Sequence, residues 1–203
     1  MKFLTIFVVF LLSFNTSLHA ETDPANESKR VMIGITDQSG SAIGLSLIPP
    51  NEPNWDTKKA GLSITLKRAG KATDENQEIE AYMIRLDKPF HPVSTYMEQI
   101  RKNTEEGYKK NPDFKLSAFD IKEYPQNPQC VRVYMLLEDV RTTRADLSQK
   151  KWSEQHMLSC GLSKHKRIGF EVRYYNRHYD QNKDELFATK ADRLFETVII
   201  EDK

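Results

Sequence analysis

Two periods in the placement of apolar residues divide the chain into strands and helices. Apolar residues at every second position are typical of a strand with one buried face, whereas spacings of three and four are typical of a helix. The first pattern predicts strands at about residues 31–36, 43–47, 62–66, 78–87, 114–124, 130–140, 155–163 and 168–176. The second predicts a helix from Val93 to about Tyr108 and another over about residues 184–197.

Turn and cap residues indicate where some of these elements begin and end. The segment "DQSGS" (residues 37–41) has the composition of a hairpin turn between the first two strands. Thr95 followed by Glu98 has the spacing of a capping box, in which each side chain bonds a backbone amide at the start of a helix. Pro112 then stops that helix, because proline cannot continue it.

These elements favour an α+β fold, with a single globular domain over residues 30–203. The strands are not separated by helices at regular intervals, so we expect a mainly antiparallel sheet of about eight strands. The mid-chain helix and the C-terminal helix are expected to pack on that sheet. A chain of this length buries roughly 70% of its unfolded surface, which is enough for one core.

The N-terminus has the three-part pattern of a secretory signal peptide over residues 1–20. Lys2 supplies a positive charge, Phe3–Phe14 is mostly apolar, and Ala20 precedes the expected cleavage site. The apolar run is short for a membrane span, which needs about 20 residues; an uncleaved anchor is the alternative. Residues 21–29 are polar and are expected to form a flexible leader. The mature protein is therefore expected to be exported, to the periplasm of a Gram-negative host and otherwise to the medium.

Two cysteines in an exported chain predict a disulfide between Cys130 and Cys160. Two free thiols or an intermolecular bridge are the alternatives. If the two cysteines face each other on antiparallel strands, the numbers of opposing residues sum to 290, so Val133 faces Met157. The hairpin would then close through residues 141–152.

The charge of the mature chain gives it no electrostatic reason to bind nucleic acid. The full chain has 30 basic and 29 acidic residues, and removal of residues 1–20 takes away only Lys2, which leaves 30 − 1 = 29 basic residues. A surface without net charge attracts neither nucleic acid nor anionic lipid. No second apolar stretch is long enough to insert into a membrane, so we expect a soluble monomer or weak oligomer.

The sequence has no local signature of catalysis, of a cofactor or of a metal site. It lacks Gly-x-Ser-x-Gly, Ser-x-x-Lys and a glycine-rich phosphate loop followed by a helix. His156 and Cys160 are spaced like two ligands on a helix, but their segment is predicted as a strand and Cys160 as half of a disulfide. We therefore expect no cofactor and no metal, and catalysis is the less favoured interpretation.

The segment "FEVRYYNRHYD" (Phe170–Asp180) concentrates aromatic, arginine and histidine side chains. Alternation from Phe170 to Tyr175 predicts one apolar and one amphipathic strand face, with a loop after Asn176. Tyrosine and arginine are enriched in interface hot spots. We therefore hypothesise a partner-binding surface formed by Arg173, Tyr175, Arg177, His178 and Tyr179. The alternative is a tyrosine-rich strand edge that runs into a loop.

The end of the chain resembles a known family. A strand "GFEVRYYNR" followed by an amphipathic helix "ADRLFETVII" is similar to the end of PsbP-like α/β/α sandwich proteins. These proteins also place a helix after an early antiparallel hairpin, as "VSTYMEQIRKNTEEGYKK" follows one here. The resemblance extends over the order of elements in about half of the chain, and residues 141–152 and the disulfide have no counterpart in it. It implies a non-enzymatic accessory or binding domain in an exported compartment, and it carries over no site residues.

The sequence thus predicts an exported, non-enzymatic protein-binding or accessory protein, such as an inhibitor or an immunity protein, with an unidentified protein partner. A hydrolase with a cryptic site and a small-ligand carrier are the alternatives. An enzyme requires a cleft with converging titratable groups, and a carrier requires an enclosed apolar cavity. A binding protein requires an exposed patch of aromatic and arginine side chains.

Overall fold

The computed structural model describes residues 29–36 and 42–203. The predicted signal peptide, all but the last residue of the predicted leader, and the predicted hairpin turn at residues 37–41 lie outside the described residues. The strands and helices below therefore belong to the part that follows the leader.

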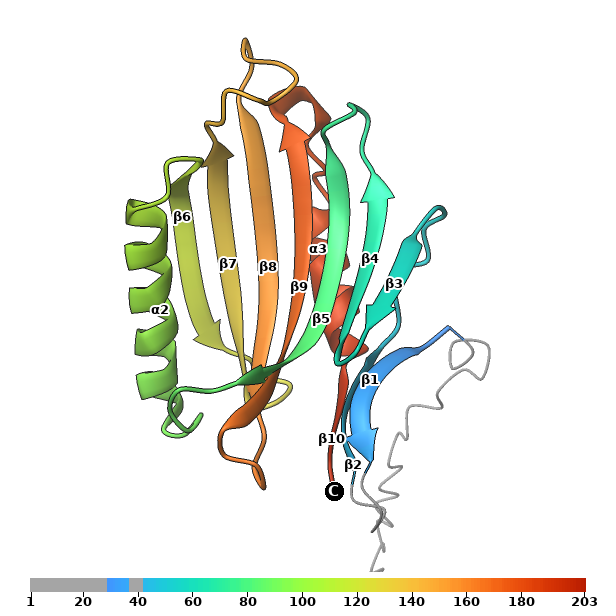
Figure 1. Ribbon diagram of the computed structural model, residues 1–203, viewed down its shortest axis with the longest axis vertical. Coiled ribbons are helices and arrows are strands. Elements are labelled where there is room, and N and C mark those ends of the chain that lie inside the picture. The colour runs from blue at the N-terminus through green and yellow to red at the C-terminus, as the bar shows by residue number, and fades with distance from the viewer. Residues whose placement is uncertain (1–28, 37–41) are drawn as a thin grey trace, which may run out of the picture.

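Seven strands form one antiparallel sheet, in the order β3-β4-β5-β9-β8-β7-β6 (Figure 1). The strands of this large sheet are β3 (Asp56–Ala60), β4 (Ser63–Ala69), β5 (Asn76–Arg85), β6 (Phe114–Glu123), β7 (Cys130–Asp139), β8 (Lys151–Gly161) and β9 (Ile168–Tyr179). β5 pairs with β9 along its whole length. The sheet thereby joins two segments that lie far apart in the sequence.

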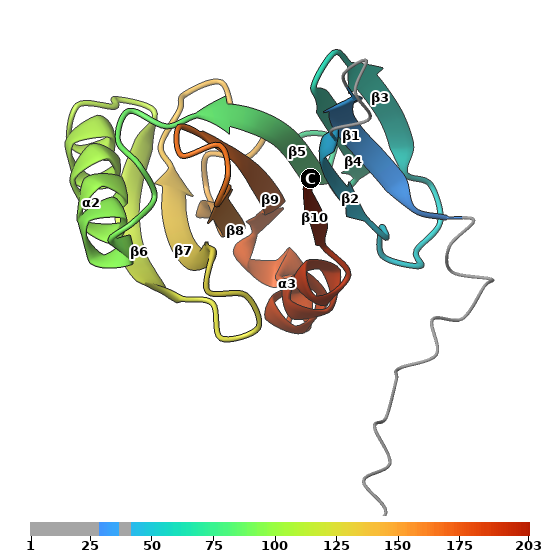
Figure 2. The same ribbon diagram turned by 90° about the horizontal axis from the view of Figure 1, so that it is seen from below.

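A second, three-stranded antiparallel sheet has the order β1-β2-β10. Its strands are β1 (Val31–Thr36), β2 (Ala42–Leu47) and β10 (Ile199–Asp202). Leu45 and Leu47 of this small sheet lie in one core cluster with Leu66 and Ile79 of the large sheet. The small sheet therefore packs on one face of the large sheet, near β4 and β5 (Figure 2).

The helices lie on the two opposite faces of the large sheet (Figure 2). They are α2 (Val93–Lys109), the short 3-10 helix η1 (Asp180–Asn182) and α3 (Phe187–Glu196). Tyr96 of α2 packs in a cluster with Val133 of β7, whereas Phe187 of α3 packs in a cluster with Leu158 of β8. We call these faces the α2 side and the α3 side; the small sheet also lies on the α3 side. No helix in the described residues is long and apolar enough to cross a bilayer.

The α+β class and the mainly antiparallel pairing predicted from the sequence are confirmed. About eight strands were predicted, and the described residues contain ten, divided between two sheets. The prediction missed β3 because all its side chains are exposed, so that it has no alternation. It missed β10 because Ile199 and Ile200 follow α3 so closely that they extend the helical pattern.

The predicted ends of several elements are wrong. β9 does not end near Asn176 but continues to Tyr179, because its last residues pair with β8 and, through Arg177, with β5. The predicted loop at residues 177–179 is therefore strand. The predicted capping box of Thr95 and Glu98 is also wrong, because the helix begins at Val93 after an extended Pro92, without a side-chain cap.

The disulfide and its strand register are as predicted. Cys130 and Cys160 are joined with an S–S distance of 2.07 Å and face each other across β7 and β8. Val133 faces Met157, as the sum of 290 requires. Both cysteines are buried, so the bond lies inside the core.

Candidate binding surface

The α2 side of the large sheet is only partly covered. α2 lies along β6, and within the described residues neither helix lies over β5 and β9 on this side (Figures 1 and 2). Because side chains alternate along a strand, every second residue of β5 and β9 points to the α2 side. We call seven of these residues the open sheet face: Glu78, Glu80, Tyr82, Glu171, Arg173, Tyr175 and Arg177.

Glu171 is the centre of a hydrogen-bond network on the open sheet face. The Tyr82 hydroxyl donates to Glu171 Oε2 at 2.6 Å, and Arg173 donates to the same oxygen from Nε at 3.0 Å and from Nη2 at 2.6 Å. The Arg173 guanidinium also lies over the Tyr82 ring, 5.3 Å from its centroid. Tyr82 lies directly opposite Glu171 in the register, so strand pairing fixes these contacts.

Two further contacts extend the network along β9. The Tyr175 hydroxyl donates to Glu80 Oε2 at 3.0 Å and accepts a bond from Arg173 at 3.4 Å. Arg177 lies over the Tyr175 ring at 5.6 Å and pairs with Glu78 at 3.7 Å. Each arginine of the open sheet face is therefore held between a tyrosine ring and a carboxylate.

Burial and neighbouring charges shift several pKa values in this network. Burial raises the pKa of Tyr175 to about 12. Burial, followed by the Glu171 carboxylate, raises the pKa of Tyr82 above its usual range. Burial by itself would lower the pKa of Arg173, but the Glu171 charge more than offsets this and the pKa rises. The tyrosines therefore stay neutral and Arg173 stays charged across the physiological range.

α2 forms one border of the open sheet face. The hydroxyls of Tyr96 on α2 and Ser159 on β8 are 2.6 Å apart and share a hydrogen bond, and Ser159 donates to Glu171 at 3.5 Å. Burial raises the pKa of Tyr96 to about 12. The hydroxyls of Tyr96 and Ser159 thus connect α2, which covers part of the α2 side, to Glu171 on the open sheet face.

The structure separates the five residues of the sequence-based hypothesis. Arg173, Tyr175 and Arg177 lie together on the open sheet face. His178 points to the α3 side and is 3% exposed, and Tyr179 is 2% exposed at the end of β9. Of the first three, Arg173 and Arg177 are half-buried and Tyr175 is 8% exposed, so the two arginines are the members of the hypothesis that reach the surface.

Tyr179 belongs to a buried polar cluster that anchors the loop between β7 and β8. Its hydroxyl donates to Asp74 Oδ2 at 3.0 Å and accepts a bond from the Asp146 backbone amide at 2.7 Å. Lys151, which is 2% exposed, donates to Asp74 Oδ2 at 2.6 Å. Burial would raise the pKa of Asp74, but the bonds from Lys151 and its neighbours lower it to about 2. A lysine has no sequence pattern that predicts burial, so this cluster could not be predicted.

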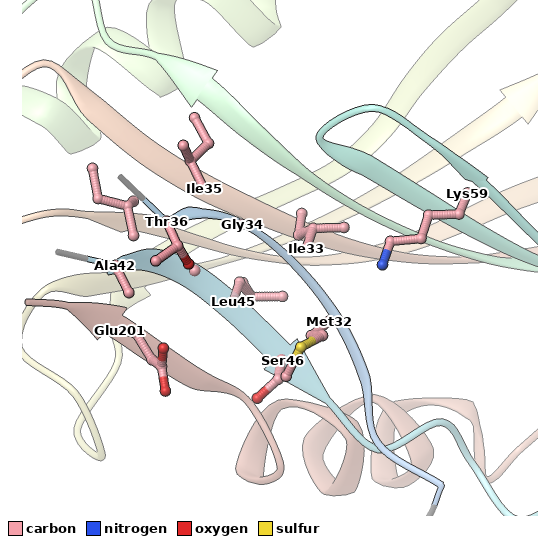
Figure 3. Close-up of a pocket in the computed structure, with 12 residues that line it drawn as sticks. Met32, Ile33, Gly34, Ile35, Thr36, Ala42, Leu45, Ser46, Lys59 and Glu201 are labelled. Carbon is pink, nitrogen blue, oxygen red and sulfur yellow. The ribbon is translucent and has the colours of Figure 1, made fainter. Parts of the chain in front are cut away.

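A shallow hollow of about 200 Å³ lies on the small sheet (Figure 3). Gly34 and Gly44, which face each other across β1 and β2, line it together with Lys59 and Glu201. Its volume is below the roughly 300 Å³ at which small-molecule sites begin. We therefore do not assign the hollow as the functional site.

No metal centre is found among the residues that the structure describes. Among them, no group of three or more histidine, cysteine, aspartate and glutamate side chains has an arrangement that could hold an ion. His156 and Cys160, which have a ligand-like spacing, lie on the strand β8, and Cys160 is bound in the disulfide.

Comparisons with known proteins give a distant structural similarity. No protein-family model matches the chain, and no curated protein matches it in sequence. Among solved structures, the Ran-binding protein Mog1p of Saccharomyces cerevisiae matches with 11% identity and a TM-score of 0.44. The match covers 85% of this chain and 96% of that chain. At this TM-score, we draw no conclusion from it.

Proposed function

We propose that this chain is an exported, non-enzymatic protein that binds a protein partner through the open sheet face, as an accessory factor or as an inhibitor. Export is inferred from the signal-peptide pattern of residues 1–20. The PsbP-like pattern at the end of the chain is consistent with a binding role.

One observation carries the proposal: Tyr82, Arg173 and Arg177 are partly exposed in fixed positions on the open sheet face, next to the buried Tyr175, and no described helix covers them. Tyrosine and arginine are the residue types that contribute most to interface hot spots. Arg173 is bonded at 2.6 Å to a carboxylate of its own strand, so its rotamer is already fixed before any partner arrives. Fixing side chains in advance reduces the entropy that binding must overcome.

The charges of the open sheet face indicate what the partner surface looks like. Its three carboxylates are matched by only two guanidinium groups, and within each pair the charges are partly neutralised. Such a face does not select for strong net charge in its partner. We expect the partner surface to carry planar apolar groups that pack against the tyrosines. We also expect it to offer a hydrogen-bond acceptor to Arg177, the arginine nearer the end of β9.

The test is an affinity capture with matched arginine variants. The mature, oxidised protein is used to capture its partner from the native envelope, and the affinity for that partner is then measured. Arg177→Ala is expected to weaken binding by more than about 1 kcal/mol, which is roughly fivefold, because Arg177 is the outer arginine of the face. Arg193→Ala is the control, since Arg193 is exposed on α3, on the opposite side of the sheet.

Equal binding by wild type, Arg177→Ala and Tyr82→Ala would exclude the open sheet face as the interface. The absence of a stoichiometric protein partner would instead favour the carrier or enzyme interpretations. Circular dichroism of each variant separates a lost interface from a lost fold.

A further inference from the structure

A polar cleft of about 460 Å³ lies mainly on the α3 side of the large sheet, near the end of β9. It is formed where the turn between β4 and β5 approaches the segment that joins β9 to α3. Its volume falls within the range of about 300–1,000 Å³ that small-molecule sites occupy. The side chains that line it are almost all polar or charged.

One of the residues that line the cleft carries a buried hydrogen-bond donor without a partner in the described residues. Asn176 of β9 lines the cleft and is 4% exposed, and its Nδ2 has no hydrogen-bond partner in the described residues. An unsatisfied buried amide costs about 1–3 kcal/mol. An acceptor placed in the cleft would remove that cost.

The two carboxylates that line the cleft are already satisfied. Glu75 accepts bonds from the backbone amides of Tyr179 and Ala72 and from the Asn182 side chain, and these bonds lower its pKa although burial opposes them. Asp184 accepts bonds from Lys190 and other donors at 2.6–3.2 Å. Neither carboxylate therefore needs a cation from outside.

Two of the lysines that line the cleft have ammonium hydrogen-bond donors that no described residue occupies. Lys71 makes no side-chain hydrogen bond or ion pair with any described residue, and Lys183 pairs only with the exposed Glu185. Arg68 and Lys190, by contrast, are both engaged by Glu52, at 2.9 and 2.7 Å. The donors of Lys71, Lys183 and Asn176 are thus left for a ligand that accepts hydrogen bonds.

We propose that this cleft binds a small molecule that carries a phosphate group. A phosphate offers several acceptor oxygens and a negative charge to the two lysines, and lysine binds phosphate as a point charge. The volume leaves room for an organic part beside the phosphate. This site is distinct from the proposed protein interface, because most of its lining lies on the opposite face of the sheet; Arg177 is the one residue of the open sheet face that also lines the cleft.

Nuclear magnetic resonance titrations at constant ionic strength test the proposal with three probes: inorganic phosphate, inorganic pyrophosphate and glycerol 3-phosphate. We expect saturable shifts of the Asn176 side-chain amide and of backbone amides near Lys71 and Lys183. The double variant Lys71→Ala/Lys183→Ala is expected to bind at least about tenfold more weakly. The matched control is Lys164→Ala/Lys166→Ala, two exposed lysines in the turn between β8 and β9.

Three results would each overturn the proposal. These are no saturable shift with any probe, unchanged affinity in the Lys71→Ala/Lys183→Ala variant, and an equal loss in the control variant, which would indicate unspecific attraction to lysine. Because Lys71 and Lys183 are exposed, both variants are expected to fold, which their amide spectra verify. Binding of inorganic phosphate without glycerol 3-phosphate would exclude an organic ligand.

Discussion

At the scale of single residues, burial decides which polar side chains can serve a surface. Arg173 and Tyr179 belong to residue types that occur both at interfaces and at the edges of cores. The sequence put both in one hypothetical surface, but Arg173 is half-buried on the open sheet face and Tyr179 is 2% exposed. Residue type therefore placed Arg173 at the surface correctly and Tyr179 wrongly. The burial of Tyr179 depends on the loop that folds over it, which residue type does not contain.

The first prediction concerns the acid stability that Asp74 provides. Its pKa is about 2 in the folded protein, below the ordinary value of 3.8, so its contribution is complete above about pH 4 and is lost as pH falls towards 2. Asp74→Asn should therefore flatten the loss of unfolding free energy between pH 4 and 2, by on the order of 1 kcal/mol because the carboxyl is partly solvated. Urea unfolding at several pH values measures this. Asp120→Asn, at an exposed aspartate, is the control, and equal pH profiles for both variants would contradict the assignment.

At the scale of strands and helices, prediction succeeded where one face of an element is buried. β7 alternates between the two sides of the large sheet, and its pattern was sufficient to fix the register with β8 through Cys130 and Cys160. β3 has no buried residue and so had no pattern to detect. The end of β9 is polar in sequence but remains strand because it pairs with β8 and, through Arg177, with β5, and a local pattern does not contain these pairings.

The second prediction tests whether the buried apolar side of α3 provides the energy with which this helix packs on the sheet. Phe187 is fully buried among Tyr174 and other core residues, whereas its neighbour Leu186 is 63% exposed. Phe187→Ala should lower the unfolding free energy by about 3–5 kcal/mol, and Leu186→Ala by less than about 0.5 kcal/mol. Chemical denaturation of the two variants gives both values. Similar losses in the two would mean that α3 is not docked as described.

The third prediction concerns the disulfide that links β7 and β8. The two cysteines are separated by 30 positions, and the loop-entropy model gives about 3–4 kcal/mol for closing a loop of this length. The Cys130→Ala/Cys160→Ala variant should be less stable than the oxidised wild type by that amount. Reductant should leave the melting temperature of the variant unchanged, and a stability loss below about 1 kcal/mol would contradict the estimate.

At the scale of the whole molecule, the open sheet face is a product of strand order. Glu80 and Tyr82 come from β5, while Glu171 and Arg173 come from β9, and the two strands become neighbours only in the folded sheet. The sequence could predict the α+β class and half of this face, because the β9 segment has a distinctive composition. It could not predict the β5 half, since no local pattern specifies that β5 pairs with β9 rather than with the strand that follows it.

The last prediction asks whether Arg173 stabilises the Glu171 carboxylate at the centre of this network. Arg173→Ala would leave the Glu171 carboxylate, whose side chain is 11% exposed, with only the Tyr82 hydroxyl and a distant Ser159 as partners. We expect a loss of about 2 kcal/mol of unfolding free energy, below the 3–5 kcal/mol typical of fully buried pairs because Arg173 is half-buried. Adding Glu171→Gln should recover part of that loss, because the charge left without its partner is then removed. If the double variant is less stable than Arg173→Ala by the full cost of Glu171→Gln alone, the two side chains act independently, and Arg173 does not stabilise the Glu171 carboxylate.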